Sequence, residues 1–480
     1  MASLWELETN IPPRQTLPGP ISAEAAVIGG GMAGLLTAWF LQERGVRTVV
    51  LEADRIGGGQ TGRTTAKLTS QHGLRYAALI RDHGVERARL YAQANQWAIG
   101  AYRALAGSLK PDCGLEECPA FLYTCRDPRS LEREHSAARS LGLPARMTTD
   151  VELPFPVKAA LVFDGQARFH PLRFLSALAE RLTIYEKTKV LSVKGCRIET
   201  DRGAVTAEHI IFAAHYPFVN FPGWYFLRMH QERSFVVALE NAQPLQGMYY
   251  GVDQPCGLSL RAAGKYLLLG GGSCRTGDCR AGGQYAALEQ AAGQYWSGCQ
   301  VTARWSAQDC IPLDGVPYIG VFSPAAPNWY VATGFQKWGM TSSMVAARII
   351  SDLVCGVKNP WLTVFSPQRS ALRASARQFF SDSLRSAGGL WRTAFFRPDM
   401  ELAALLPGRG GLVLRNGKKV GAYRDENGEL YLVSPKCPHL GCQLEWNPEE
   451  KTWDCPCHGS RFDFRGRLLD GPAQSDLAQP

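Results

Sequence analysis

The chain of 480 residues is 45% hydrophobic and carries a net charge of +9, from 52 basic and 43 acidic residues. This length suffices for two or three packed domains. No apolar run approaches the roughly 18 residues of a membrane-spanning helix, and residues 1–20 lack the basic head and apolar core of a secretory signal. We therefore expect a cytoplasmic protein without a membrane span.

Basic and acidic residues are both spread along the chain, so we expect no nucleic-acid partner. The net positive charge suits an anionic cofactor, an acidic redox partner or a solvated surface.

A glycine-rich turn follows the first apolar run. Residues 25–28 predict a buried parallel strand, which leads into Gly29-x-Gly31-x-x-Gly34 and an apolar helix. In such a turn the glycines allow a tight bend, close approach of a pyrophosphate and packing of the helix on the strand. Glu52 ends the next predicted strand, where an acid binds ribose hydroxyls, so the motif indicates FAD or NAD rather than NADP. The alternative is a glycine-rich turn of another α/β unit.

The loop over residues 57–67 is rich in glycine and threonine, so it can donate many hydrogen bonds to a long cofactor. An ordinary surface loop is the alternative. Here the chain resembles the D-amino-acid-oxidase-like family of FAD-dependent amine and amino-acid oxidoreductases, in which such a loop follows the flavin diphosphate. The resemblance implies FAD. The cofactor-binding residues that we expect are Gly29, Gly31, Gly34, Glu52, Gly59, Thr61, Thr64, Thr65, Ala66, Val190, Gly334, Gly339, Met340 and Thr341.

Beyond this loop, helical spacing gives way to strand patterns. We predict helices over 86–109, 132–140 and 171–182, then strands over 189–193, 197–200, 209–214, 235–239, 249–252 and 265–269. Residues 270–272, three glycines, are predicted to end the last strand; they lack the spacing of a second dinucleotide motif, so we expect no NAD site. A strand over 329–332 precedes a glycine turn and a helix from 342 to about 353.

The resemblance also implies a domain division. We expect an α/β FAD-binding (Rossmann-type) domain with an α+β substrate domain over residues 1–360, then a linker with a helix over 361–407, and a small all-β domain over 408–480. Within residues 1–360, the predicted cofactor segments are roughly 20–75, 160–215 and 305–360, and the predicted substrate segments are roughly 76–159 and 216–304.

Four residues are candidates for contact with a substrate. Arg261 can bind a carboxylate. His215 follows the predicted strand over 209–214, and Lys337 and Trp338 lie beside the expected flavin ring. Each of these side chains has a structural role as its alternative, and for His215 a hydrogen-bonded core position has equal weight.

The segment after residue 410 contains two short ligand motifs. Cys437 and His439 have the spacing C-x-H, and Cys455 and His458 the spacing C-x-x-H. Two cysteines and two histidines are the ligands of a Rieske [2Fe–2S] cluster. The alternative is a zinc site, but zinc motifs expect a C-x(2–4)-C pair in place of C-x-H. The two loops closely resemble Rieske proteins over about seventy residues.

The Rieske resemblance implies three further features. A disulfide is expected between Cys442 and Cys457, one residue from each cluster loop, and Ser460 is expected to hydrogen-bond a cluster sulfur. Phe462 replaces a tyrosine of the quinol-oxidising complexes and cannot donate a hydrogen bond. We therefore expect a potential in the middle or lower part of a range of roughly −150 to +300 mV.

The chain has 14 cysteines, of which ten lie between residues 113 and 355. We interpret these ten as reduced, mostly buried thiols. The pair Cys274 and Cys279 has a five-residue offset without histidines, which is a poor metal motif.

Together these motifs predict a flavin dehydrogenase or oxidase that acts on an amino acid or amine. Hydride from the carbon next to nitrogen passes to FAD, and the Rieske cluster relays electrons one at a time to an external acceptor, a redox protein or a quinone. Two alternatives remain open: a reductase fed by a nicotinamide, and a redox-sensing electron-transfer protein without a turnover substrate. A ring-hydroxylating oxygenase would need an iron held by two histidines and a carboxylate, and the histidines outside the cluster motifs show no close ligand pair.

Overall fold

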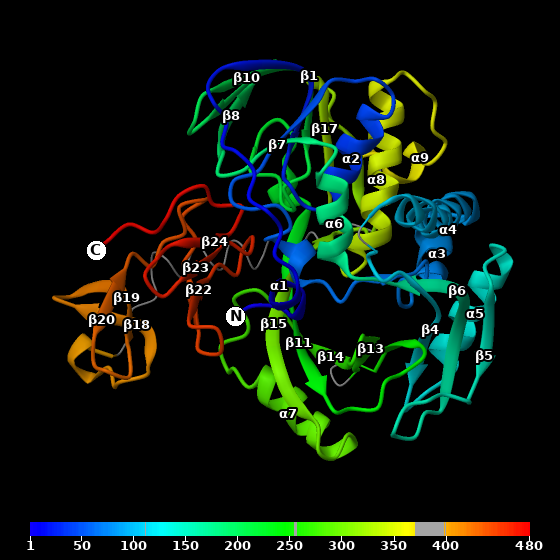
Figure 1. Cartoon of the computed structure of the whole chain (residues 1–480). Coiled ribbons are helices and arrows are strands. Elements are labelled where there is room, and N and C mark those ends of the chain that lie inside the picture. Colours follow the sequence, from blue (N-terminus) through cyan, green and yellow to red (C-terminus); the bar gives the residue numbers. More distant parts are fainter. Residues whose placement is uncertain (111, 254–256, 370–397, 399) are drawn as a thin grey trace.

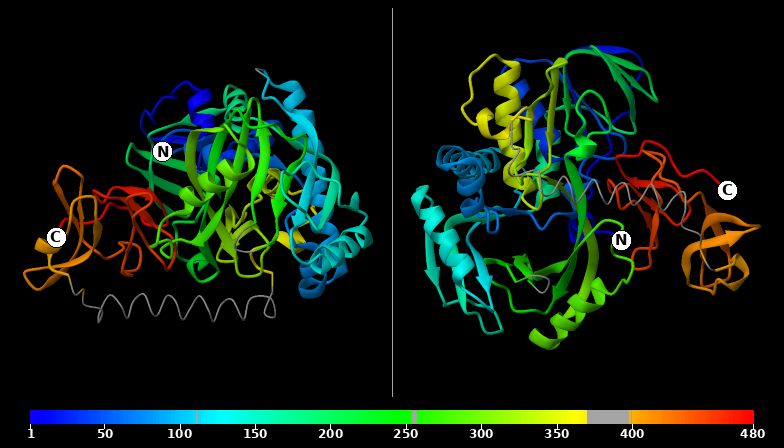
Figure 2. Two further views of the ribbon diagram at one scale, coloured as in Figure 1. Left: turned by 90° about the horizontal axis from the view of Figure 1, so that it is seen from below. Right: turned by 180° about the vertical axis from the view of Figure 1, so that it is seen from behind.

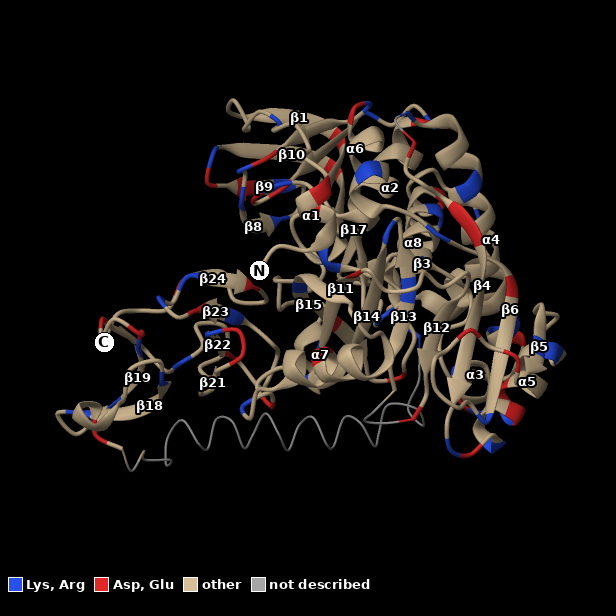
Figure 3. Ribbon diagram, turned by 60° about the horizontal axis from the view of Figure 1, so that its bottom comes forward, with Lys and Arg blue, Asp and Glu red and all other residues tan. Residues whose placement is uncertain are grey.

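The computed structural model describes residues 1–110, 112–253, 257–369, 398 and 400–480. It has two large sheets with helices packed around them, and a small part made of two further sheets (Figure 1). The small part, which contains the last residues of the chain, lies at one side of the molecule in both views of Figure 2. Basic and acidic residues are scattered over both parts (Figure 3).

The first sheet is mostly parallel, in the order β16-β17-β10-β1-β2-β7, with β9 attached to β10 and β8 to β9. Residues 25–28 of the central strand are buried because helices and neighbouring strands surround this apolar run, as is usual for a parallel sheet. The strands are β1 (Ile21–Ile28), β2 (Thr48–Leu51), β7 (Thr183–Tyr185), β8 (Val190–Lys194), β9 (Arg197–Thr200), β10 (Ala204–Phe212), β16 (Tyr318–Ser323) and β17 (Ala326–Thr333).

The second sheet has the order β15-β11-β14-β13-β12-β4-β6-β3, with β5 paired to β6. Its strands are β3 (Lys67–Leu68), β4 (Glu116–Thr124), β5 (Ala145–Thr148), β6 (Ala159–Arg168), β11 (Met229–Glu240), β12 (Met248–Gly251), β13 (Ser259–Ala263), β14 (Tyr266–Arg275) and β15 (Gln300–Pro312). The prediction that residues 270–272 end a strand is wrong, because β14 runs through these glycines and pairs there with β11. Glycine in a strand allows another group to approach the backbone closely, and these three glycines line a cavity described below.

The helices pack on the two large sheets. α2 lies beside α8 against the first sheet, and α3, α4 and α5 lie near β4 to β6 (Figure 1). No helix among the described residues is long and apolar enough to cross a membrane. The helices are α1 (Leu4–Glu8), α2 (Met32–Gln42), α3 (Tyr76–His83), α4 (Val85–Ser108), α5 (Arg129–Ser140), α6 (Pro171–Ala179), α7 (Gln284–Tyr295), α8 (Gly339–Val354) and α9 (Leu362–Phe365), with short 3₁₀ turns η1 (Gln60–Arg63), η2 (Tyr225–Leu227) and η3 (Leu402–Ala404).

The small part consists of two antiparallel sheets, β18-β19-β20 and β21-β22-β23-β24. Its strands are β18 (Gly410–Arg415), β19 (Lys418–Arg424), β20 (Leu430–Val433), β21 (Glu445–Asn447), β22 (Thr452–Asp454), β23 (Arg461–Asp463) and β24 (Leu468–Asp470). The helix that we predict within the linker 361–407 falls mainly on residues 370–397, outside the described residues.

Candidate functional site

The glycine-rich turn lies at the end of β1 and opens onto a cavity of about 380 Å³, called the first cavity here. Gly29 and Gly31 line it. Gly34 does not, but a Cβ atom at Gly34 would lie 1.9 Å from the carbonyl oxygen of Gly29. The third glycine therefore lets α2 pack directly on the turn, and the other two leave the cavity open for a cofactor.

Glu52 directly follows β2 and lies on the wall of the first cavity. Its carboxylate accepts hydrogen bonds from the backbone N–H groups of Gly30, at 2.6 Å, and Asp54, at 2.8 Å. Burial raises the pKa of Glu52, while these two hydrogen bonds oppose the shift. The arrangement holds an acceptor at the position where the motif requires a partner for ribose hydroxyls.

The predicted cofactor residues divide into two groups. The residues that line the first cavity are Gly29, Gly31, Glu52, Gly59, Thr61, Thr64, Val190, Gly339 and Met340. Gly34, Thr65, Ala66, Gly334 and Thr341 do not line it. Of these five, Thr65 lines the neighbouring cavity, and the Thr341 hydroxyl lies 3.1 Å from Nε2 of the buried His72. Thr341 is therefore a buried residue whose hydroxyl is bound within the protein, away from the lining of the first cavity.

A second cavity, of about 100 Å³, adjoins the first. The two cavities share five lining residues: Thr64, Ala307, Asp309, Lys337 and Met340. The predicted residues Lys337 and Trp338 both line the second cavity, and the Trp338 ring stacks on His72 with centroids 5.0 Å apart. We call the first cavity the cofactor chamber from here on. The junction of the two cavities is suited to hold the reactive ring of a cofactor beside the smaller second cavity, which suits a substrate.

Lys337 is held by oxygen atoms at the junction. Its Nζ donates to the hydroxyls of Ser234, at 2.6 Å, and Ser273, at 2.9 Å, and lies 3.5 Å from Oδ2 of Asp309. Burial works against the charge of Lys337, but Asp309 and Glu232 raise its pKa. Burial also raises the pKa of Asp309, and Lys337 opposes that shift.

Lys67, which no sequence motif singles out as a site residue, is a second ammonium group that lines the second cavity. Its Nζ donates at 2.7 Å to the carbonyl oxygen of Tyr249 and to the hydroxyl of Ser259. Burial, together with the nearby Arg261, lowers the pKa of Lys67 to about 7. Its position at the end of the glycine- and threonine-rich loop over residues 57–67 is the sequence signal that points to it.

Arg261 is not placed to bind a substrate. It lines neither cavity, and its guanidinium donates to the carbonyl oxygens of Ala262, Ala66 and Phe169. Burial lowers the pKa of Arg261 to about 9. The prediction that Arg261 binds a substrate carboxylate is wrong, because its donors already hold the backbone between β3 and β13.

His215 lines the first cavity. Its Nε2 lies 3.2 Å from Sγ of Cys310, and its backbone has a φ of +64°. Burial lowers the pKa of His215, against the effect of Asp470 and Asp309. The ring is therefore a neutral group that faces the cofactor chamber. This position is compatible both with contact to a substrate and with a hydrogen-bonded structural role.

The cluster motifs form two neighbouring loops of the small part. The side chains of Cys437 and Cys455 are almost fully buried, and the rings of His439 and His458 lie 5.0 Å apart. Burial and the nearby His458 lower the pKa of His439 to about 4, and its Nδ1 is buried without a hydrogen-bond partner. A neutral imidazole with an unused buried nitrogen beside cysteine thiols fits the ligand set of a Rieske cluster.

Of the two histidines in these loops, His458 is buried and His439 is partly exposed. The exposed fraction of His458 is 3%, and its backbone oxygen accepts a hydrogen bond of 2.6 Å from Nε2 of Gln231 on β11. The Ser460 hydroxyl hydrogen-bonds the Cys437 thiol and opposes the rise of the pKa of that thiol. The hydrogen bond of Ser460 to a cluster sulfur stays a prediction.

The disulfide pairing differs from our expectation. The structure does not bond Cys442 to Cys457, although their sulfur atoms and that of Cys455 all lie within 4.8 Å of one another. Instead a disulfide joins Cys274 and Cys279, because a turn after β14 brings the chain back on itself. Both were predicted as reduced thiols, and that prediction is wrong for this pair.

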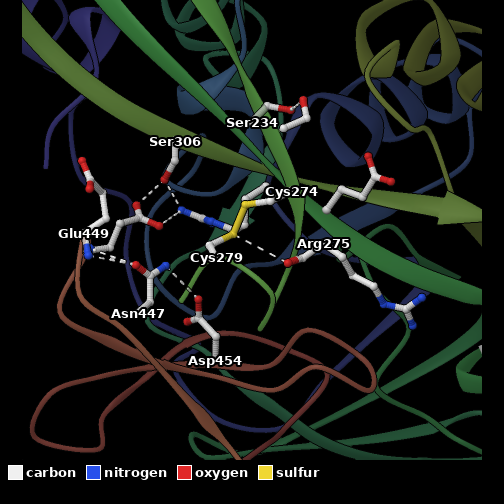
Figure 4. The surroundings of a disulfide bond; sticks show 12 residues. Ser234, Cys274, Arg275, Cys279, Ser306, Asn447, Glu449 and Asp454 are labelled. Carbon is white, nitrogen blue, oxygen red and sulfur yellow. Dashed lines mark hydrogen bonds and ion pairs between the residues drawn. A yellow bond between two sulfur atoms is a disulfide. The ribbon is translucent and has the colours of Figure 1, made fainter. Parts of the chain in front are cut away.

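The disulfide loop packs on the small part of the chain. A Cβ atom at Gly277 would lie 2.6 Å from Cα of Pro456, between the two cysteines of the second cluster loop. Figure 4 shows the disulfide together with Asn447 and Asp454 of the strands β21 and β22. Sequence patterns carry no signal for this contact, because it joins residues nearly two hundred positions apart.

Buried charges join the two parts of the chain. Arg233 on β11 is fully buried and forms an ion pair of 2.5 Å with Glu450. Arg461 also pairs with Glu450, at 2.9 Å, and with Asp470, at 3.0 Å. Asp470 and its neighbours line the first cavity, as residues 468–474. The small part therefore completes the wall of the cofactor chamber.

Known proteins show the same two parts. The family model for FAD dependent oxidoreductases (DAO) matches residues 24–353, and the model for the Rieske [2Fe-2S] domain matches residues 400–480. The chain is 39% identical over 492 aligned positions to the Rieske 2Fe-2S iron-sulfur protein YhfW of Bacillus subtilis (strain 168). This alignment covers 99% of the chain and 96% of YhfW.

Solved structures share the fold of the first part. Glycine oxidase from Geobacillus kaustophilus matches with a TM-score of 0.63 and 21% identity, over 73% of this chain and 99% of that one. An L-amino acid deaminase from Proteus vulgaris matches with a TM-score of 0.60 and 17% identity, over 75% of this chain and 96% of the deaminase chain. The chain thus belongs to the D-amino-acid-oxidase-like family of FAD-dependent oxidoreductases and carries a Rieske [2Fe–2S] domain after its FAD-binding part.

Proposed function

We propose that this enzyme oxidises the C–N bond of an amino acid or amine and passes the electrons, one at a time, through its Rieske cluster to an external acceptor. FAD supplies the chemistry of hydride acceptance, and the cluster that of single-electron transfer. The substrate loses two electrons and two protons, and the resulting imine takes up water to give a carbonyl compound and ammonia or an amine. A redox protein or a quinone is the acceptor.

One observation supports the proposed electron relay from the flavin to the cluster. The chamber that contains Gly29, Gly31 and Glu52 of the FAD motif is also lined by residues 468–474 of the Rieske domain. A tethered partner that forms part of the cofactor wall is available at a high effective concentration. This geometry supports electron transfer within one chain over transfer from the flavin directly to an external acceptor.

The second cavity supports a substrate with a carboxylate. Two ammonium groups, Lys67 and Lys337, line it together with the Ser234 and Ser259 hydroxyls. An apolar wall is supplied by Trp338 and its neighbours. We infer that one of the two ammonium groups attracts the carboxylate and that Trp338 packs on the rest of the substrate. Structural neighbours named glycine oxidase and L-amino acid deaminase agree with this substrate class.

We also propose the domain division that the sequence suggests, with the oxidoreductase over 1–360, a linker over 361–407 and the Rieske domain over 408–480. β6 and β15 belong to the second sheet, and two of the four proposed crossings between cofactor and substrate segments fall within these two strands.

An anaerobic screen tests the proposed function. Purified protein is mixed with amino acids and amines, and flavin absorbance near 450 nm is followed. Bleaching by at least one amine, followed by the EPR signal of a reduced cluster, is the expected result. Bleaching by NADH or NADPH and by no amine would instead identify the nicotinamide-fed reductase. No bleaching by either class would favour an electron-transfer protein without a turnover substrate.

A further inference from the structure

We propose that Asn220, a residue of the FAD-binding part, positions the cluster ligand His439, so that the histidine end of the cluster is an internal junction of the two domains. Asn220 follows β10 in a loop that leads to η2. Its Oδ1 lies 2.9 Å from Nε2 of His439. The positioning role rests on the Rieske ligand set alone; only its use as a junction rests on the proposed relay.

The hydrogen bond decides which nitrogen of His439 is available to iron. An amide oxygen accepts hydrogen bonds and does not donate them, so Nε2 of His439 carries the proton. Its Nδ1 then has a free lone pair, and this atom is buried without a partner. Metal-binding histidines usually donate their other N–H to a fixed acceptor, which sets the tautomer, orients the ring and raises the basicity of the ligand. Asn220 is such an acceptor, supplied from another domain.

Other contacts close the same end of the cluster. The ring of Phe226, on η2, meets the rings of His439 and His458 edge-on, with centroids 6.3 and 5.9 Å away. Nε2 of Gln308, on β15, donates to the carbonyl oxygen of Gly459 at 2.7 Å. The cluster loops thus contact β11, β15 and η2 of the same chain.

The fit at Gly459 leaves little freedom. Gly459 has a φ of +83°, and a Cβ atom there would lie 2.6 Å from Cβ of Gln231. A side chain at this position therefore requires a shift of either domain. The histidine end of the cluster faces the flavoprotein, and we infer that electrons enter the cluster from that side.

The test compares Asn220→Leu, which removes the acceptor at similar volume, with Asn220→Asp, which keeps an acceptor and adds negative charge. Asn427→Leu, the same change at an exposed residue of the β19–β20 turn, is the matched control. For each variant the EPR spectrum of the dithionite-reduced cluster, its midpoint potential, the rate of iron loss to a chelator and the FAD content are measured.

We expect opposite shifts of the potential. Asn220→Leu makes His439 a weaker donor and raises the midpoint potential, whereas Asn220→Asp makes it a stronger donor and lowers the potential. Iron loss should be about 10- to 100-fold faster in Asn220→Leu, with FAD content unchanged and Asn427→Leu like the parent. Loss of the cluster in Asn220→Leu but retention in Asn220→Asp also supports the proposal. Parental EPR and potential in Asn220→Leu, shifts of the same sign in both variants, or equal loss of the cluster in both would overturn it.

Discussion

Glu52 shows how one buried carboxylate can fix a cofactor. The sequence predicts its role from its place about twenty residues after the glycine turn, and the structure places it on the wall of the first cavity. Burial raises its pKa, and its two backbone hydrogen bonds oppose that shift. Ribose hydroxyls would supply further donors.

Glu52→Ala should therefore weaken FAD binding without touching the cluster. Losing hydrogen bonds to a charged acceptor costs about 1.5–3 kcal/mol, or roughly a 10- to 150-fold higher Kd. The measurement is fluorescence titration of the apoprotein with FAD, with iron content as the control. An unchanged Kd would remove Glu52 from the site.

Lys67 predicts a pH dependence. Its pKa is lowered to about 7 by burial and by Arg261, so its positive charge is present below pH 7 and is lost as the pH rises above it. The KM for an amino-acid substrate should therefore rise between pH 7 and 8.5, by up to about 10-fold per pH unit if Lys67 holds the carboxylate. Lys67→Met should have a high KM at pH 6 and a flat profile. Identical profiles for parent and variant would show that the carboxylate binds elsewhere, with Lys337 as the next candidate.

The sequence could predict those residues whose role follows from a local motif. Gly29, Gly31 and Glu52 line one chamber because a strand, a turn and a helix place them there. Arg261 had only its charge as a signal, and its donors are taken by backbone carbonyls. Gln308 and Asp309 had no signal, because they come together with the FAD motif only when β15 crosses the molecule.

Among the elements, α2 depends on a contact that only glycine allows. A Cβ atom at Gly34 would meet the Gly29 carbonyl oxygen at 1.9 Å. Gly34→Ala should push α2 away from β1, lower stability by about 1–3 kcal/mol, as overpacking does, and reduce FAD content.

Gly100→Ala is the control for this change. Gly100 lies within α4, and a Cβ atom there has nothing within 4 Å. Because alanine is the better helix former, by about 0.5–1 kcal/mol, this variant should be as stable as the parent or more so. Thermal unfolding with and without added FAD compares the two. A Gly34→Ala protein with parental stability and FAD content would contradict the close-packing role.

Element types follow the sequence where periodicity is strong, and boundaries do so less well. α4 spans Val85–Ser108, close to the predicted 86–109, because its apolar stripe is long and regular. α8 begins at Gly339, three residues before the predicted start. Glycine is a poor helix former, so its presence in the first turn made the sequence indicate a later start. β14 continues through its glycines because pairing with β11 outweighs their low strand preference.

For the whole molecule, the two domains are visible in the sequence but their contact is not. Each domain has a local motif with fixed spacing. The contact joins Arg233 to Glu450 and Gln231 to His458, pairs more than two hundred positions apart without a pattern in sequence. This contact places the cluster loops against the flavoprotein and makes the Rieske domain a wall of the cofactor chamber.

We propose that electrons pass from the flavin to the cluster within one chain and leave from there. This proposal is tested most directly by His458→Ala, which removes a cluster ligand and leaves the FAD motif untouched, measured by stopped-flow reduction of the flavin beside steady-state reduction of an acceptor protein too large to enter the cofactor chamber. Substrate should still reduce the flavin at the parental rate, while turnover with the acceptor should be lost. Acceptor turnover at the parental rate in a variant that lacks the cluster would contradict it and would leave the Rieske domain a structural or regulatory role.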